Sequence, residues 1–321
     1  MGRGIMKNWW SRSVKIAALW SICALTFFCL FQMALRNSSS AQRVADSSRP
    51  TISTGSSIAN AEQRSILYTQ LAKELDEKGA VFLKQGQTSQ SLSLSDLFIL
   101  KDGTLAPMLK VADPPVRANV LHLSTEFSVP ISEAVKNILL PYFGEAIWFQ
   151  NSSMYHFSMF HASHHIAPVP ASELQIEAEA RAVKDVSKSI CPMNIFLDRV
   201  VLTSTGVLLG CWQVVSGADP VTIRAKLKSA LPHAPQKQLY NEAMLHTSFC
   251  KTPWPPLSLQ EEKKMSDLQI FHELVSRLNR KIAGLKATVS ELWYVEEYDL
   301  LALALNGKMK IRKFNFGCSE A

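Results

Sequence analysis

Two short stretches of the chain place a serine two positions after a histidine within an apolar setting. They are His156-Phe157-Ser158 and His246-Thr247-Ser248. On a β-strand, residues two apart point to the same side, so each stretch would present an imidazole beside a hydroxyl. An imidazole carries a proton near neutral pH, and a hydroxyl donates a hydrogen bond to a phosphate oxygen. Two such pairs across a cleft would hold one phosphate and move protons on both sides of it.

The tripeptide alone is weak, because four of the eight histidines have a serine two positions later: His122, His156, His161 and His246. The setting separates them. Apolar neighbours at alternating positions around His156 and His246 predict strands that bury one face and turn His and Ser to the other. His161 would fall on the apolar face, which predicts a supporting or loop residue. His122 ranks third, since no helix and hairpin follow it.

The second half of the chain contains one unit twice. Each copy has a His-x-Ser strand, a loop, a helix and then a hairpin, with about forty residues between the motif histidine and the hairpin. The first copy has a motif strand over 146–160, a helix from Ser172 with Gln175 as a capping box, and strands over 193–202 and 207–215. The second has a helix over 266–282 and strands over 289–295 and 300–305, before a last strand over 308–316. Such duplication predicts two similar lobes around a cleft.

Other elements are predicted from the spacing of apolar residues and from the glycine, proline and capping residues at their ends. An amphipathic helix is expected over 63–78, with Ile66, Leu67, Leu71 and Leu75 on its apolar face and Gly79 after its end. Short strands are expected over 80–83 and 120–124, with irregular structure and further short strands between them. A helix over 131–140 should end before Pro141. Asp219-Pro220 starts a helix reaching about Leu231, with Asp as cap and Pro at the first position.

This arrangement resembles the two-histidine phosphoesterase superfamily, which includes the RNA ligase/cyclic nucleotide phosphodiesterase-like proteins. The matching residues are His156-Phe157-Ser158 and His246-Thr247-Ser248, with Ser where Thr is more usual in the family. The likeness covers about residues 60–318. It implies that His156 and His246 act as general acid and base, in an order left open, and that Ser158 and Ser248 bind the phosphate. It also implies that neither a metal nor a cofactor is needed.

The N-terminal part has a different character. Ile16 to Leu35 is a run of twenty residues without a formal charge, long enough to cross a bilayer as a helix. Four basic residues precede it, which predicts a cytosolic tail over 1–15 and a single-pass type II anchor rather than a cleaved signal peptide. A Ser-rich flexible stem is expected over 36–60 and a luminal domain over 61–321. The short span favours the Golgi or endoplasmic reticulum.

Luminal placement makes disulfides an option for the four cysteines beyond the span: Cys191, Cys211, Cys250 and Cys318. Sequence allows three connectivities or four buried thiols. Sequons at Asn37 and Asn151 are expected to be little used.

Charge argues against nucleic-acid binding by a basic surface. The formal charge is +7, but residues 1–36 hold five basic residues and no acidic one. Subtracting those five from the 34 basic residues leaves 29 against 27 acidic residues, so the rest of the chain is near neutral. DNA is therefore not an expected partner. The expected partner is a small nucleotide or an RNA-end phosphodiester.

The expected fold is α+β, with two pseudosymmetric αβ lobes whose antiparallel sheets line a central cleft. The expected function is a metal-independent phosphodiesterase acting on a 2′,3′-cyclic phosphate or a similar phosphodiester. Two alternatives stay open: a catalytically inactive binding relative of that fold, and a Golgi type II glycosyltransferase-like protein. The chain lacks the Asp-x-Asp that would hold a metal-bound sugar nucleotide, and it lacks a Gly-rich phosphate loop and a nucleophile elbow. Oligomeric state is not predicted.

Overall fold

The computed structural model describes residues 54–80, 97–101, 104–252, 266–300 and 305–317. The predicted anchor over 16–35, most of the predicted stem and the expected strand over 80–83 lie outside these ranges, apart from Ala80, which is in no strand. Within them, no helix is both long and apolar enough to cross a membrane. The residues from Thr54 onward form one compact unit.

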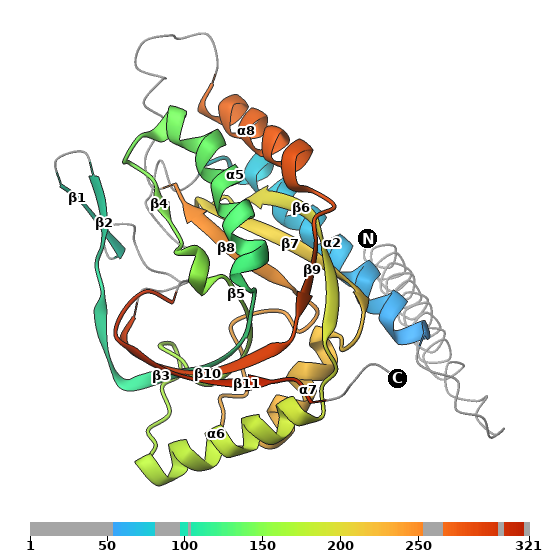
Figure 1. Ribbon diagram of the computed structural model, residues 1–321. Coiled ribbons are helices and arrows are strands. Elements are labelled where there is room, and N and C mark those ends of the chain that lie inside the picture. Colours follow the sequence, from blue (N-terminus) through green and yellow to red (C-terminus); the bar gives the residue numbers. More distant parts are fainter. Residues whose placement is uncertain (1–53, 81–96, 102–103, 253–265, 301–304, 318–321) are drawn as a thin grey trace, which may run out of the picture. The chain divides into compact units, whose positions relative to one another are not determined.

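Two antiparallel sheets form the body of this unit (Figure 1). The four-stranded sheet has the order β11 (Met309–Asn315), β10 (Glu291–Leu300), β3 (Lys110–His122) and β5 (His156–Ser163). The five-stranded sheet has the order β4 (Trp148–Phe149), β8 (His246–Lys251), β7 (Val207–Ser216), β6 (Met193–Leu202) and β9 (Lys286–Val289). A separate hairpin joins β1 (Phe98–Lys101) and β2 (Thr104–Pro107). The fold is thus a mixture of helices and antiparallel sheets, as predicted.

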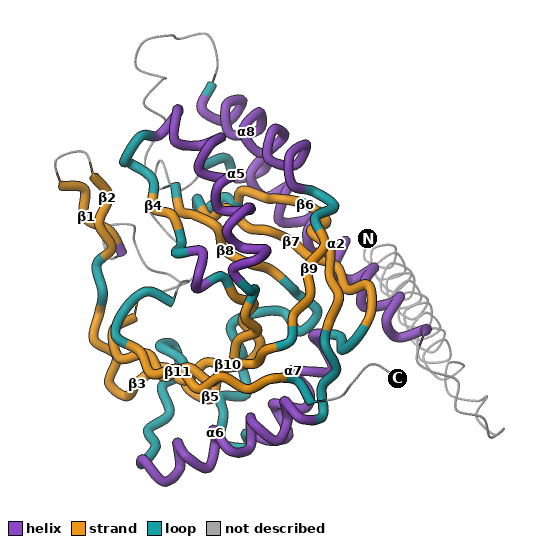
Figure 2. The backbone as a smooth tube through the Cα atoms, in the orientation of Figure 1, coloured by secondary structure: helices purple, strands orange, loops and turns teal. Residues whose placement is uncertain are grey.

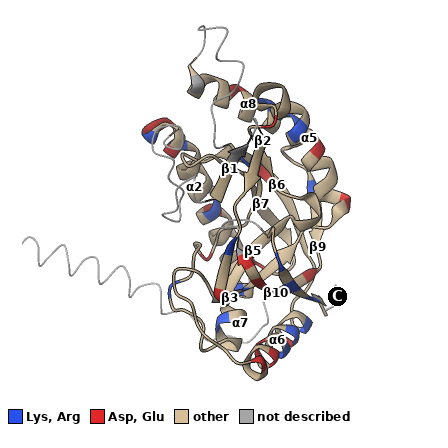
Figure 3. Cartoon of the chain, turned by 90° about the vertical axis from the view of Figure 1, so that its left-hand side faces the viewer, with Lys and Arg blue, Asp and Glu red and all other residues tan. Residues whose placement is uncertain are grey.

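Four helices cover the apolar faces of the sheets (Figure 2). Helices α5 (Thr125–Phe143) and α8 (Asp267–Ile282) pack on each other, and α8 also packs on β6. Helices α6 (Glu173–Lys188) and α7 (Pro220–Ala230) pack on β10, β11 and β5. Their apolar side chains join those of both sheets in one continuous core, which includes Phe157 and Phe249 from the two motif strands. Charged residues of both signs intermingle on the helices (Figure 3), in line with the near-neutral composition.

Helix α2 (Thr54–Lys78) packs on a different face. Its Tyr68 joins Val207, Leu209 and Cys211 of β7 in a smaller core on the other side of the five-stranded sheet. The helix begins within the predicted stem. Most of its predicted apolar face is confirmed, since Leu75 is buried and Leu67 and Leu71 pack against the smaller core, whereas Ile66 is 54% exposed. Arg64 and Tyr68 are also almost fully buried, and apolar spacing missed them because they are an arginine and a tyrosine.

Several local predictions are confirmed. Ser172 and Gln175 form the capping box of α6, and Ser266 and Gln269 form a second one at α8. Asp219 caps α7 with Pro220 in the first turn. Gly79 and Gly206 have the positive φ angles that the helix end and the turn between β6 and β7 need.

The predicted motif strand over 146–160 is wrong as a single element. Asn151 accepts a hydrogen bond from the Ser153 amide and starts a short 3-10 helix, Ser152–Met154. This turn separates β4, in the five-stranded sheet, from β5, in the four-stranded sheet. The predicted strand over 289–295 is split at Ser290 in the same way, into β9 and β10. The chain therefore changes sheets twice at short interruptions.

These two interruptions change how the two repeated units are distributed over the sheets. The second hairpin pairs β10 with β11. Of the predicted strand over 300–305, residues 301–304 lie outside the described residues. The first hairpin, β6 and β7, lies in the sheet of the second motif strand, and the second hairpin lies in the sheet of the first. Each sheet therefore combines one motif strand with the hairpin that follows the other motif. The two units interleave, whereas successive lobes were predicted.

Two further elements continue across prolines at which the sequence analysis did not expect them to continue. Helix α5 contains Pro130 and Pro141, so it is longer at both ends than the predicted 131–140. The short strands β1 and β2 agree with the irregular structure and short strands expected before Pro115, but β3 is longer than expected because it runs across Pro114 and Pro115. Among the cysteines, Cys191 is disulfide-bonded, while Cys211 and Cys250 are buried free thiols.

Candidate active site

The two motifs occupy equivalent places in the two sheets. In β5, His156 pairs with His122 and Ser158 with Val120 of β3. In β8, His246 pairs with Cys211 and Ser248 with Leu209 of β7. His and Ser therefore share one face of each strand, while Phe157 and Thr247 between them are fully buried. This confirms the predicted alternation.

Each motif strand bulges at the same position. The register of β5 shifts after Ser158, which leaves Met159 unpaired, and the register of β8 shifts after Ser248, which leaves Phe249 unpaired. Both extra residues come three positions after the motif histidine. A Cβ on Gly210 would lie 2.3 Å from Cζ of Phe249, so the glycine makes room for this bulge. The repeated bulge relates the strands more specifically than the tripeptide does.

The bulge changes which later residues share the motif face. After it, His161 pairs with Ala118 and Lys251 with Val207, on the same side as the motif residues. The prediction that His161 lies on the apolar face is therefore wrong, because one extra residue inverts the alternation. Lys251, at the equivalent place in β8, was missed. In a strand without a bulge, a period of two would place both residues on the face opposite to the motif residues.

A buried arginine joins the two motif strands. Arg224 of α7 is 7% exposed and donates only to backbone carbonyls. Its Nε bonds the Met159 carbonyl at 3.0 Å, and its Nη2 bonds those of Ser158 and Met244 at 2.8 Å each. Its Nη1 reaches the Glu242 carbonyl. One guanidinium thus ties the bulge of β5 to the segment that leads into β8.

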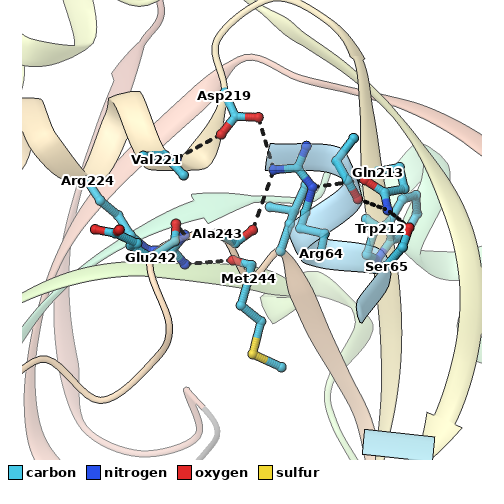
Figure 4. A network of polar contacts seen from close by, with 12 residues as sticks. Arg64, Ser65, Trp212, Gln213, Asp219, Val221, Arg224, Glu242, Ala243 and Met244 are labelled. Atoms are coloured by element: carbon cyan, nitrogen blue, oxygen red, sulfur yellow. Dashed lines mark hydrogen bonds and ion pairs between the residues drawn. The ribbon is translucent and has the colours of Figure 1, made fainter. Parts of the chain in front are cut away.

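Helix α2 holds the remaining carbonyls of that segment (Figure 4). Arg64 reaches the Ala243 carbonyl at 3.5 Å and forms a 2.9 Å ion pair with Asp219, the cap of α7. The Tyr68 hydroxyl lies 2.8 Å from the Leu245 carbonyl and accepts from the Leu245 amide. The backbone carbonyl of each of the four residues before His246 is therefore held by the side chain of Arg64, Tyr68 or Arg224.

Aromatic contacts tie the motif strands together on the core side. Tyr155 packs against Phe249 with ring centroids 5.5 Å apart, and Phe157 meets Trp212 edge-on at 5.8 Å. Strands β5 and β8 thus lie side by side although they belong to different sheets.

The two motif imidazoles have different surroundings. His156 Nδ1 lies 2.8 Å from the Met154 carbonyl, which only accepts, so Nδ1 holds the proton and Nε2 keeps a lone pair in the neutral ring. Burial lowers the pKa of His156, and His122 adds to this shift against the Met154 bond. Burial, then the charges of Arg224 and His156, lowers the pKa of His246 to about 3.

Polar groups on the motif face lack hydrogen-bond partners. Within the described part of the chain, the hydroxyls of Ser158 and Ser248 make no hydrogen bond, and neither do His246 Nδ1 and Lys251 Nζ, which are both buried. Lys251 is 4% exposed, and burial lowers the pKa of its amine to about 7. Buried polar atoms without partners are costly and uncommon. Of the eight such buried atoms in the described ranges, His246 Nδ1 and Lys251 Nζ lie on the face that carries the motifs.

The other two histidines that are followed by a serine two positions later have structural partners. His122 stacks on Trp293 with centroids 4.0 Å apart, and its Nε2 lies 3.1 Å from the Ser153 carbonyl. The backbone of His161 exchanges hydrogen bonds with the side chain of Gln238. Tyr240 contacts both His161 and His246, at 6.4 and 4.9 Å between ring centroids. No group of three His, Cys, Asp or Glu residues that would suit a metal ion occurs in the described ranges.

No protein-family model matches the chain, and no curated protein matches its sequence. Solved structures resemble it distantly. TT0787 of Thermus thermophilus has 10% identity and a TM-score of 0.41, over 64% of this chain and all of that one. Escherichia coli LigT complexed with NADP+ has 11% identity and a TM-score of 0.37, over 64% of this chain and 99% of that one. Kluyveromyces marxianus Usb1 with uridine monophosphate has 11% identity and a TM-score of 0.34, over 62% and 98%. With TM-scores below 0.5, these likenesses assign no activity.

Replacing Arg224 tests its role as the joint between the motif strands. Arg224→Met leaves the carbonyls of Ser158, Met159, Glu242 and Met244 without this donor, so we expect the free energy of unfolding to fall by about 3–5 kcal/mol. Denaturant unfolding measures this loss. Lys228→Met on the exposed side of α7 is the matched control and should change stability by less than about 0.5 kcal/mol. Equal effects of the two changes would contradict the assignment.

Proposed function

We propose that the protein is a metal-independent phosphodiesterase that opens a 2′,3′-cyclic phosphate or a similar phosphodiester. The observation that carries this proposal is the equivalence of the two motif strands. Each presents a histidine and an unbonded serine hydroxyl on one face, with the same bulge immediately after the serine. A phosphate bound between the strands would have one imidazole on each side of it. The hydroxyls of Ser158 and Ser248 would donate to its nonbridging oxygens.

His156 is the better base for hydrolysis. Its Nδ1 proton is held by the Met154 carbonyl, so Nε2 can take a proton from water as the water oxygen bonds to phosphorus. The bond from phosphorus to the 2′ or 3′ oxygen then breaks, and that oxygen takes a proton from His246. In the free protein His246 is neutral at pH 7. An anionic phosphodiester beside it favours the protonated ring, which supplies the acid after substrate binds.

Lys251 supplies a positive charge on the same face. Its Nζ lies over the Phe98 ring, 5.9 Å from the centroid, but has no hydrogen-bond acceptor among the described residues. A buried amine without an acceptor costs free energy, which a bound anion would offset. With a pKa of about 7, the amine is charged in acidic solution and about half charged at neutral pH. It would attract the phosphate anion without holding any metal.

The motif histidines give the first test. In full chain purified in detergent, nucleoside 2′,3′-cyclic phosphates should be hydrolysed in the presence of a chelator. His156→Ala and His246→Ala should each lower kcat/KM by about 10²- to 10⁴-fold. His233→Ala, an exposed histidine in the loop after α7, should leave it unchanged. Loss of activity with the chelator, or full activity in either motif variant, would reject the mechanism. Tight binding without turnover would favour an inactive binding relative.

Lys251 predicts a pH dependence of substrate binding. The amine is charged below its pKa of about 7, so the affinity for a cyclic phosphodiester should be constant below pH 7 and fall above it by up to about tenfold per unit. The diester stays a monoanion in this range. Calorimetry between pH 6 and 9 measures the affinity in chain carrying both His156→Ala and His246→Ala, because this leaves neither motif imidazole to take up a proton when the diester binds. Lys251→Arg should remove the fall, and Lys251→Met should bind weakly throughout while raising the free energy of unfolding by about 1–3 kcal/mol. A fall that persists in Lys251→Met would exclude this residue as its cause.

We also propose that the chain is a single-pass type II membrane protein with its folded part in the lumen of the Golgi or endoplasmic reticulum. The uncharged run from Ile16 to Leu35 and the basic residues before it support this placement. The disulfide at Cys191 fits an oxidising compartment.

Membrane placement predicts the behaviour of the expressed chain in cell fractions. After alkaline carbonate extraction it should stay in the membrane pellet, because an apolar span of this length inserts stably. In intact vesicles the folded part should resist added protease, and detergent should abolish that protection. Deleting residues 16–35 is the control and should release the chain. Extraction of the full chain by carbonate would contradict the anchor, and digestion in intact vesicles would contradict the orientation.

A further inference from the structure

A small cavity lies beside the second motif, and α2 forms one of its walls. Its volume is about 220 Å³. His246 and Ser248 line it together with the turn between β6 and β7, Tyr240 before β8, and Leu71 and Glu74 of α2. It is therefore continuous with the motif face of β8, on the side that α2 covers.

Helix α2 is a fixed wall of this cavity. Arg64 and Tyr68, two turns and one turn before Leu71, are 1% and 0% exposed. They hold Asp219, Gln213 and the carbonyls of Trp212 and Leu245. Removing the helix from the sheet would leave a buried carboxylate and several carbonyls without partners, which costs several kcal/mol. Leu71 and Glu74 are thus placed by interactions that lie outside the cavity.

Size and chemistry restrict what the cavity can accept. It is smaller than the roughly 300–1,000 Å³ that drug-sized ligands occupy, so it has room for one base or sugar and not for a nucleotide chain. Its walls are mostly apolar, from Leu71, Val207 and Leu209 among others. Glu74 is the one carboxylate among the described residues that line it. A carboxylate accepts hydrogen bonds from N–H and O–H groups and repels a further phosphate.

We propose that this cavity holds one part of the nucleoside attached to the phosphate, its base or its sugar, and that Glu74 selects against a second phosphate on that nucleoside. The substrate would then be a lone 2′,3′-cyclic mononucleotide with a free 5′ hydroxyl, in preference to a 5′-phosphorylated nucleotide or an RNA end. This inference rests on the proposed phosphodiesterase function. Glu74 is half-buried and forms an i, i+4 ion pair with Lys78 at 3.4 Å, so its charge is only partly neutralised.

The test compares one nucleoside 2′,3′-cyclic phosphate with and without a 5′-phosphate. Full chain in detergent should have the higher kcat/KM for the compound with the free 5′ hydroxyl. Glu74→Gln should reduce this preference by about three- to tenfold, the size of one charge–charge interaction in a partly solvated site. Glu77→Gln removes the same charge from an exposed position on α2 outside the cavity and should leave the preference unchanged. Lys78→Gln, which leaves Glu74 without its partner, should increase the preference.

An unchanged preference in Glu74→Gln, or the same change in Glu77→Gln, would overturn the proposal. Thermal unfolding of each variant checks that the fold is kept. The affinities of the two compounds, measured by calorimetry, separate this inference from the activity. If the chain binds both compounds and hydrolyses neither, the phosphodiesterase function fails while the ratio of affinities still tests Glu74. If it binds neither, both proposals fail.

Discussion

The geometry of the candidate site depends on one buried guanidinium. Arg224 bonds the carbonyls of Ser158 and Met159 in one motif strand and those of Glu242 and Met244 beside the other. No backbone ladder joins β5 to β8 in the described part of the chain, because they belong to different sheets. Their separation is therefore set by this side chain and by the aromatic pairs on the core side. A planar, charged donor with a fixed fork suits this role, since a flexible lysine cannot reach four carbonyls at once.

Arg224 is itself positioned through a chain of contacts that ends in α2. It lies in α7, whose N-terminus is capped by Asp219, and Asp219 is paired with Arg64. Burial lowers the pKa of Arg224 to about 10, which leaves the guanidinium charged at neutral pH. Two buried cations near one segment repel each other, and Asp219 offsets part of that repulsion. Helix α2, which lies far from the motifs in sequence, thus belongs to the framework of the site.

Local chemistry in the sequence predicted much of this structure. The capping residues Ser172 and Asp219, the turn at Gly206 and the alternation around His156 and His246 each report on a few neighbouring residues, and all four were read correctly. The predictions that failed concern contacts between residues that are far apart in the sequence. The exchange of hairpins between sheets follows from the short interruptions at Ser152–Met154 and Ser290, which resemble irregularities within one strand. Pairing partners, not apolar spacing, decide where such a strand ends.

In the candidate site, too, the residues that follow from local sequence were predicted and those that depend on a neighbouring strand were missed. The two histidines and two serines could be named because a period of two places them. His161 and Lys251 could not, because each follows a bulge, and a bulge is recognised only from the strand opposite. Gly210 is the one hint in the sequence, a glycine within a strand where a neighbouring ring needs space. Since Arg224 bonds the carbonyls at the bulge of β5, the irregularity that hid His161 is also the point at which the two strands are joined.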